Sequence, residues 1–278
     1  MKINGIIPEK ENRLEKRLKE LGNRKEKALT VYLMGGDPDI KLSEEILISA
    51  LDNGADILEI GVPFSDPMAD GPVIQKAAIR SLDSKNNTDN IFEMTASLRV
   101  KREAPFLLML YYNTIFRYGT ERFIEKASLS GIDALIIPDL PPEESEEIVH
   151  LADKKNIIII SFITPTTSEI RMKNILKSAR GFIYCVALSG VTGERKEVAP
   201  GLSKMVNSAR RYTECPLFAG FGISTPEQAK EASMEADGII VGSAIITELE
   251  NNLSQKDIIP QIIGAKVASL KEAILKGA

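Results

Sequence analysis

The sequence has only one histidine and two cysteines among its 278 residues. His150 lies in a segment with the pattern of a surface helix, so a histidine-rich metal site or a Ser-His-Asp triad has almost no residues to build on. We therefore predict no metal site. Cys185 and Cys215 lie in or beside apolar, strand-like segments, which indicates buried free thiols in a reducing compartment rather than a disulfide framework.

The chain also lacks a long apolar run and an excess of positive charge. Its purest apolar stretch, residues 157–160, has the length of a strand, whereas a membrane helix needs ~20 apolar residues. The N-terminal residues lack the apolar core of a secretion signal. The formal net charge of -4 offers no electrostatic attraction to nucleic acid or to an anionic membrane. We expect a cytoplasmic protein with neither of these as a partner.

What the sequence does contain is a regular alternation of short apolar segments with longer amphipathic ones. The apolar segments are mostly non-alternating, which is typical of parallel strands that are covered by helices. Eight such alternations in one chain predict a single domain over residues 1–278, an α/β protein with the (β/α)8 TIM-barrel fold. The predicted strands are 30–35, 57–62, 106–111, 134–138, 157–163, 181–188, 216–220 and 238–241.

Amphipathic segments fill the intervals between these strands. In residues 8–21, Leu14, Leu18 and Leu21 form a narrow apolar stripe that predicts an additional N-terminal helix over one end of the core. An open doubly wound sheet is the alternative fold. However, the Gly-Gly-Asp-Pro turn at 35–38 lacks the third glycine of a dinucleotide-binding loop, so we expect no nicotinamide cofactor. The other predicted helices are 43–53, 73–82, 88–102, 120–130, 142–155, 168–178, 202–212, 226–234 and 257–276.

One predicted strand carries a carboxylate. Alternation along 57–62 sends Glu59 to the same face as Ile57 and Gly61. Burying an ionised carboxylate costs several kcal/mol unless it is paired, and the usual outcome is a raised pKa, which suits a group that exchanges protons near neutral pH. The alternative is a structural ion pair with a lysine or arginine, but no neighbouring predicted strand offers an obvious basic partner.

Other candidate groups lie at the carboxyl ends of the predicted strands, where TIM-barrel enzymes hold their working residues. Asp70 lies in the loop after the second strand, and its alternative role is to cap the helix at 73–82. Glycine sites follow the seventh and eighth strands, which are neighbours in a closed barrel, and Gly193 follows the sixth. Exposed amides there, together with the hydroxyl of Ser243, predict a phosphate site, although each glycine alone is typical of a turn. These glycines are Gly220, Gly222 and Gly242.

A longer motif resembles a known family. The run Leu58-Glu59-Ile60-Gly61-Val62-Pro63-Phe64-Ser65-Asp66-Pro67-Met68-Ala69-Asp70-Gly71-Pro72 is similar to the signature of the tryptophan synthase alpha chain family. This signature is highly specific, whereas the glycine pairs are shared with many phosphate-binding barrels. The resemblance extends over nearly the whole chain, through residues 35–38, 111–113, 138–141, 189–193, 220–223 and 242–244.

The resemblance implies a lyase that cleaves indole-3-glycerol phosphate by a retro-aldol reaction into indole and glyceraldehyde 3-phosphate. Glu59 would protonate the indole ring carbon and take up the side-chain hydroxyl proton, and Asp70 would accept a hydrogen bond from the indole nitrogen. Further residues implied at the site are Tyr184 and Thr192, which support it, and Tyr32, Tyr111 and Phe221, which surround the indole.

The resemblance also implies a partner. The family works as an alpha2beta2 complex with a beta chain that carries pyridoxal phosphate, whereas this chain itself needs no cofactor. Phe64, Met68 and the turn at 141–142 are apolar loop residues that would suit the contact.

Two alternatives remain open at this point. One is a non-catalytic regulatory subunit that binds a phosphorylated ligand. The other is a different phosphate-binding barrel enzyme, such as a sugar-phosphate isomerase, which could use Glu59 alone. A Schiff-base aldolase is disfavoured because none of the eight predicted strands contains a lysine.

Overall fold

The computed structural model describes residues 11–186, 201–220 and 222–277. Its strands form one parallel sheet in the order β5-β4-β3-β2-β1-β9-β8-β7-β6. β5 and β6 are two halves of one segment interrupted at Ile160; β5 pairs with β4 and β6 pairs with β7. The strands are β1 (Ala28–Met34), β2 (Ile57–Gly61), β3 (Phe106–Met109), β4 (Ala134–Ile136), β5 (Ile158–Ile159), β6 (Ser161–Ile163), β7 (Ile183–Cys185), β8 (Leu217–Ala219) and β9 (Gly238–Val241).

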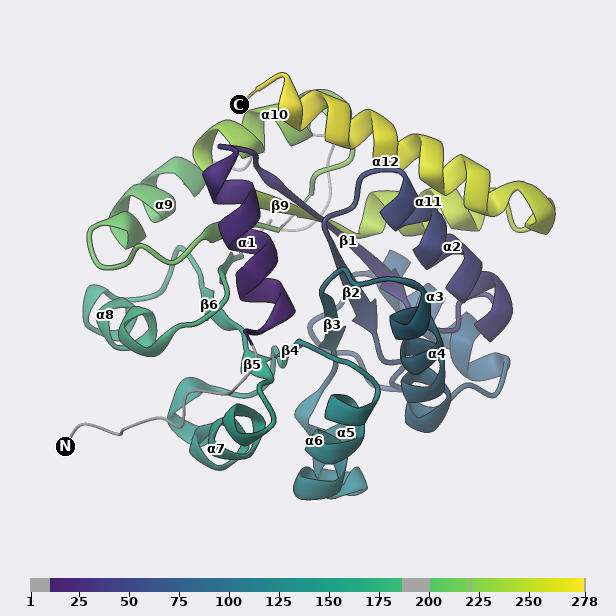
Figure 1. The fold of residues 1–278 in the computed structure, drawn as a ribbon, viewed down its shortest axis with the longest axis horizontal. Helices are drawn as coiled ribbons and strands as arrows, with labels where there is room; N and C mark the ends of the chain where they lie inside the picture. The colour runs from purple at the N-terminus through teal and green to yellow at the C-terminus, as the bar shows by residue number, and fades with distance from the viewer. Residues whose placement is uncertain (1–10, 187–200, 221, 278) are drawn as a thin grey trace.

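Because one segment pairs on both sides, the sheet returns to its starting point and closes as a barrel (Figure 1). The predicted TIM barrel is confirmed, and the open doubly wound sheet is wrong. The predicted fifth strand, 157–163, covers both halves of the interrupted segment, so the barrel has eight strand positions.

Helices surround this barrel and alternate with its strands as predicted, and α1 precedes the first strand. The prediction missed α5, a short helix directly after β3. The helices are α1 (Arg13–Asn23), α2 (Ile40–Asp52), α3 (Pro72–Asp83), α4 (Thr88–Lys101), α5 (Tyr112–Tyr118), α6 (Thr120–Leu129), α7 (Glu146–Lys154), α8 (Glu169–Ser178), α9 (Leu202–Arg210), α10 (Pro226–Glu235), α11 (Ser243–Asn251) and α12 (Ile259–Leu275), with 3₁₀ turns at Pro142–Glu144 and Lys256–Ile258.

Alternation along the strands separates two apolar clusters. In β2, Leu58 and Ile60 belong to the larger cluster between the barrel and the helices, whereas Ile57 belongs to the cluster inside the barrel. Phe182 and Phe218 stack inside the barrel with their ring centroids 4.2 Å apart. Since Glu59 shares the face of Ile57, its side chain is directed into the barrel.

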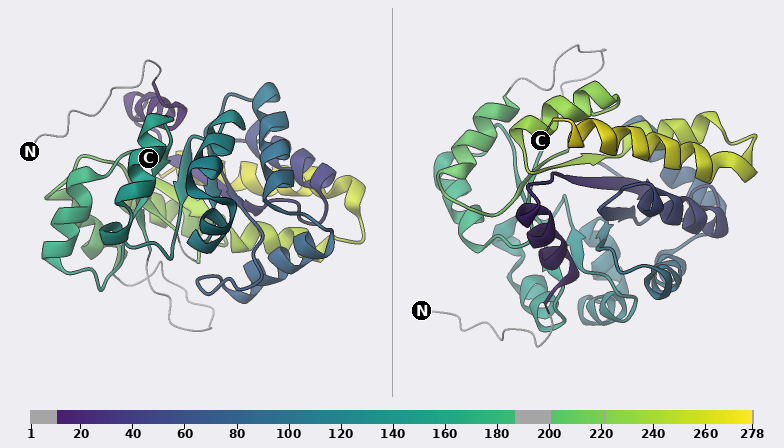
Figure 2. Two further views of the ribbon diagram at one scale, coloured as in Figure 1. Left: turned by 90° about the horizontal axis from the view of Figure 1, so that it is seen from below. Right: turned by 45° about the horizontal axis from the view of Figure 1, so that its top comes forward.

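The predicted N-terminal helix covers one end of the barrel. Figure 1 looks onto this end, with α1 lying across the ring of strands, and the left view of Figure 2 shows α1 at one extremity of the molecule. Leu14 and Leu21 are buried in the inner cluster. Asn12 caps the helix by accepting from the Leu14 amide at 2.8 Å and donates to the carbonyl of Asp133 at 3.0 Å.

The outer ring closes at the C-terminal helix, because α12 packs between α2 and α10 (Figure 1). Its buried residues include Ile263, Val267 and Leu270. Within the described part of the chain, no helix is long and apolar enough to cross a membrane.

Replacing Leu14 with alanine should lower the free energy of unfolding by about 3 kcal/mol, because the side chain is fully buried and its removal leaves a cavity under α1. Chemical denaturation measures this change. Leu129→Ala is the control, since Leu129 is 77% exposed and its loss should change stability little. Equal effects of the two substitutions would contradict the role of α1 as a packed cover.

Candidate active site

Glu59 lies in β2 with its side chain inside the barrel. It is only 3% exposed, and its register neighbours are Tyr32 in β1 and Leu107 in β3. Among the described residues, its Oε2 atom has no hydrogen-bond partner and its carboxylate forms no ion pair, so the predicted lack of a basic partner holds for this part of the chain. Burial, with added repulsion from Asp70, raises the pKa of Glu59 to about 8.

Asp70 lies in the loop after β2, half-buried beside Glu59. Burial raises the pKa of Asp70 to about 6, and a hydrogen bond from the Tyr111 hydroxyl limits that rise. The alternative capping role is wrong, because the N-cap of α3 is Gly71 and no side chain caps this helix. Near pH 7, Asp70 is therefore mainly ionised whereas Glu59 is mainly protonated.

Tyr111 is held on two sides. Its hydroxyl oxygen accepts a hydrogen bond from the Ala69 amide at 2.9 Å, and its ring stacks on Phe64 with centroids 5.3 Å apart. The next residue, Tyr112, begins α5, and its amide donates to the carboxylate of Asp139 at 2.9 and 3.1 Å. Asp139 thus supplies the cap that α5 lacks locally and fixes the position of Tyr111.

Two further tyrosines border the acids from other strands. Tyr32 in β1 is buried, and Tyr184 in β7 is half-buried and stacks on Phe162. Burial and the negative charges of Glu59 and Asp70 raise the pKa of both tyrosines well above the ordinary value. The structure therefore brings together five predicted residues: Glu59, Asp70, Tyr32, Tyr111 and Tyr184.

The predicted glycines leave room for these tyrosine rings. A Cβ atom on Gly242 would come within 3.0 Å of the Tyr32 ring, and one on Gly220 would overlap the ring of Tyr184. Gly222 has φ +58, a conformation that side chains disfavour. Ser243 is the first residue of α11, so the first backbone amides of this helix lie directly after the end of β9.

Three predicted site residues, Thr192, Gly193 and Phe221, lie outside the described residues. Conversely, sequence reasoning missed Thr30 and Phe162, whereas Asp139 belongs to the motif at 138–141 on which the resemblance rests. Thr30 lies in β1 two residues before Tyr32, and its buried Oγ1, like the hydroxyl of Tyr32, has no hydrogen-bond partner in the described regions. Alternation along β1 could have predicted this position, because it places Thr30 on the same face of the strand as Tyr32.

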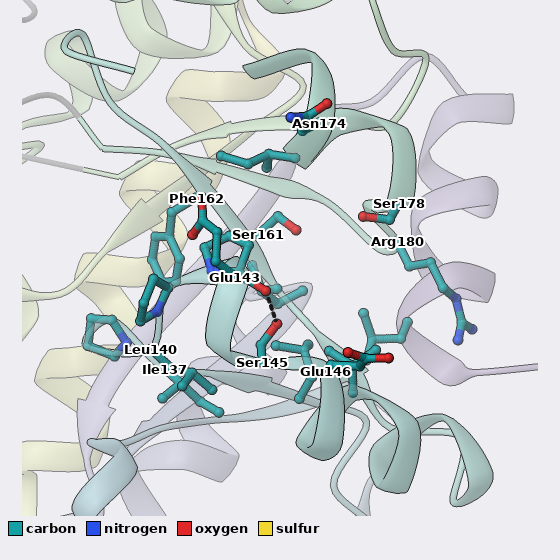
Figure 3. A pocket seen from close by; sticks show the side chains of 18 of the residues that line it. Ile137, Leu140, Glu143, Ser145, Glu146, Ser161, Phe162, Asn174, Ser178 and Arg180 are labelled. Atoms are coloured by element: carbon teal, nitrogen blue, oxygen red, sulfur yellow. Dashed lines mark hydrogen bonds between the residues drawn. The ribbon is translucent and has the colours of Figure 1, made fainter. Parts of the chain in front are cut away.

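A groove lies apart from these acids. The groove has a volume of about 1240 Å³, runs between α7 and α8, and is lined by these helices and by residues of the segment 158–162 of the barrel wall (Figure 3). Neither Glu59 nor Asp70 lines it. Phe162 borders the groove and also stacks on Tyr184, so this ring separates the groove from the site. The acids and the groove are two distinct features of the surface.

The remaining reactive groups are the metal-ligating side chains, the two cysteines and His150. In the regions that the structure covers, no cluster of three His, Cys, Asp or Glu side chains is arranged to hold a metal ion. Both cysteines are free; burial raises the pKa of Cys185 to about 12 and that of Cys215 to about 11, which keeps them as unreactive thiols. His150 is exposed on α7.

The fold and the site are those of a (β/α)8-barrel enzyme, with two acids of unlike pKa at the carboxyl end of the barrel. Comparison with known proteins gives the family. The sequence model of the tryptophan synthase alpha chain matches residues 18–274, and the chain belongs to this family.

Individual relatives match this chain along nearly their whole lengths. The tryptophan synthase alpha chain of Citrifermentans bemidjiense is 43% identical over 96% of this chain and 99% of its own. The structure of the Legionella pneumophila subunit alpha superposes with a TM-score of 0.87 at 36% identity, covering 96% of this chain and 100% of that chain. The structure of tryptophan synthase from M. tuberculosis superposes with a TM-score of 0.85 at 25% identity, covering 95% of this chain and 99% of that chain. The chain is a lyase that cleaves indole-3-glycerol phosphate, the alpha reaction of tryptophan biosynthesis.

Substituting Tyr111 with phenylalanine should raise the pKa of Asp70 above about 6, because the hydrogen bond that favours its ionised form is lost. The acidic limb of the pH profile of kcat/KM should move to higher pH by the same amount. Tyr118→Phe is the matched control, since Tyr118 donates to the remote Asp89 at 2.6 Å. An unmoved limb in Tyr111→Phe would show that this hydrogen bond does not set the ionisation of Asp70.

Proposed function

We propose that Glu59 and Asp70 divide the work of indole-3-glycerol phosphate cleavage, Glu59 as the proton donor and acceptor and Asp70 as the permanent negative charge. The observation that carries this proposal is the opposed protonation of two neighbouring carboxyl groups, with pKa values of about 8 and about 6. One acid is held neutral and the other charged at the same pH, which is what the two roles require.

In the first step, protonated Glu59 donates its proton to the indole ring carbon that carries the glycerol phosphate chain. The ring becomes a cation with its charge at the nitrogen. Asp70 accepts a hydrogen bond from that N–H group and stabilises the developing charge. The Tyr111 hydroxyl keeps Asp70 ionised for this purpose.

In the second step, Glu59, now ionised, removes the proton from the side-chain hydroxyl next to the ring. The oxygen electrons form the aldehyde C=O bond, the carbon–carbon bond to the ring breaks, and its electron pair neutralises the ring cation. Indole and glyceraldehyde 3-phosphate result, and Glu59 is protonated again, so protons and electrons balance over the cycle.

The phosphate of the substrate would bind between the ends of β8 and β9. Gly220, Gly222 and Gly242 expose the backbone there, and α11 offers its first amides and the Ser243 hydroxyl. Thr192, Gly193 and Phe221 complete the proposed set from outside the described residues. Tyr32, Tyr111 and Tyr184 would border the indole ring.

The proposed partner is a beta chain that carries pyridoxal phosphate, in an alpha2beta2 complex, while this chain, as one cytoplasmic domain, needs no cofactor. Two described loops support a contact beside the site. Met68 is 88% exposed between the two acids in sequence, and Pro142 is exposed after β4. An exposed methionine at the mouth of the barrel suits an apolar partner surface.

Glu59→Gln should lower kcat for indole release by at least about 100-fold, because glutamine neither donates nor accepts the transferred proton. Asp70→Asn should lower kcat by about 100-fold, because the charge opposite the ring nitrogen is lost. Indole release from indole-3-glycerol phosphate, with and without a pyridoxal phosphate beta chain, measures both.

The alternatives give different patterns in this assay. An isomerase that relies on Glu59 alone would leave Asp70→Asn active on its own substrate. If the wild-type chain binds the phosphorylated substrate but releases no indole even with the beta chain, the catalytic proposal fails and a regulatory subunit takes its place.

A further inference from the structure

We propose that Arg80 is a positioning residue for Asp70, acting through a buried ion pair that joins three elements of the site. Its guanidinium contacts the turn after β1 and the end of α11, and it lies on α3, the helix that directly follows Asp70. This inference rests on the proposed role of Asp70.

The start of α3 has no side-chain cap. Gly71 occupies the N-cap and provides no side-chain bond, so the helix is not anchored by its own first residue. Asp70 lies two residues before Pro72, the first residue of the helix, and the Gln75 side chain donates to the Asp70 carbonyl at 2.9 Å. A shift of α3 along or across its axis would therefore carry Asp70 with it.

Arg80 makes a two-point bond to the turn after β1. Its Nε and Nη2 atoms donate to the two carboxylate oxygens of Asp37 at 2.8 and 2.7 Å. Asp37 is only 2% exposed, so solvent screens this pair weakly. Ser81 on the same helix donates to the Gly35 carbonyl at 2.7 Å, which strengthens the attachment of α3 to the strand that carries Tyr32.

The same guanidinium reaches the helix of the proposed phosphate site. Nη1 of Arg80 lies 3.6 Å from Glu250 near the end of α11, and Lys76 lies 3.3 Å from the same carboxylate. α3 packs against both β1 and α11. One planar cation thus fixes the helix after Asp70 relative to the helix that begins at Ser243, a geometry that the single ammonium of lysine cannot reproduce.

Arg80→Lys should lower kcat for indole release about tenfold, since a displacement of Asp70 of less than 1 Å weakens its contact with the ring nitrogen. The acidic limb of the pH profile should also move, because the surroundings of Asp70 change; a loss of stability alone would leave this limb in place. Arg102→Lys is the matched control, because Arg102 makes a comparable two-point bond to Asp52 at 2.7 to 3.0 Å on the outer surface. Its kcat and pH profile should match the wild type.

A double-substitution cycle separates this inference from the proposed function. If Arg80 acts through Asp70, Arg80→Lys should reduce kcat in the wild type and not in the Asp70→Asn background. Full activity of Asp70→Asn would overturn the proposed function itself. Impaired Asp70→Asn with a normal or independently additive Arg80→Lys would overturn the positioning role alone.

A second variant covers the case in which Arg80→Lys does not fold. Glu250→Gln keeps the bond between Arg80 and Asp37 and weakens only the link to α11, so kcat should fall about threefold with the same non-additivity toward Asp70→Asn. Unchanged kcat and an unchanged acidic limb in Glu250→Gln would contradict the proposed coupling between α3 and α11.

Discussion

The carboxyl group of Glu59, buried inside an apolar barrel without a counter-charge among the described residues, is the constraint on which the site depends. An ionised group there would lose its hydration and gain no compensation, so the fold favours its neutral form. The folded pKa of about 8 exceeds the ordinary 4.5. The contribution of Glu59 to stability is therefore complete below the unfolded pKa and declines as pH rises through about 8. The burial that keeps Glu59 protonated near pH 7 therefore lowers the stability of the fold at that pH.

Asp70, the second acid, must instead stay ionised, and the surrounding elements favour that form. Asp70 stays ionised because Tyr111 donates to it, and Tyr111 is held in turn by α5, whose first amide is bound by Asp139. The backbone position of Asp70 follows α3, which Arg80 attaches to β1 and α11. A barrel suits this division, because both acids come from β2 and the loop after it while Tyr32 and Tyr184 reach them from β1 and β7, and the packed wall keeps these strands in register.

The features that follow from local patterns could be predicted from the sequence. Alternation over five residues was enough to direct Glu59 inward, and eight apolar segments were enough to predict the barrel. What the sequence could not supply are contacts between distant residues. The cap of α5 comes from Asp139, 27 residues beyond Tyr112, so no local signal marked this helix. The bond between Arg80 and Asp37 joins residues 43 positions apart, so no local sequence pattern predicts it either. Proximity of Asp70 to an ordinary helix start suggested capping, which only the geometry of Gly71 excluded.

The most direct test of the central claim is the protonation state of Glu59 itself. Infrared difference spectroscopy of the chain with isotopically labelled glutamate, titrated from pH 5 to pH 9 against Glu59→Gln, follows one carboxyl group without any substrate. The account predicts a neutral carboxylic acid band that persists through pH 7, disappears near pH 8 and is absent from the variant. Ionisation of Glu59 close to its ordinary value of 4.5 would contradict the assignment of this group as the proton donor.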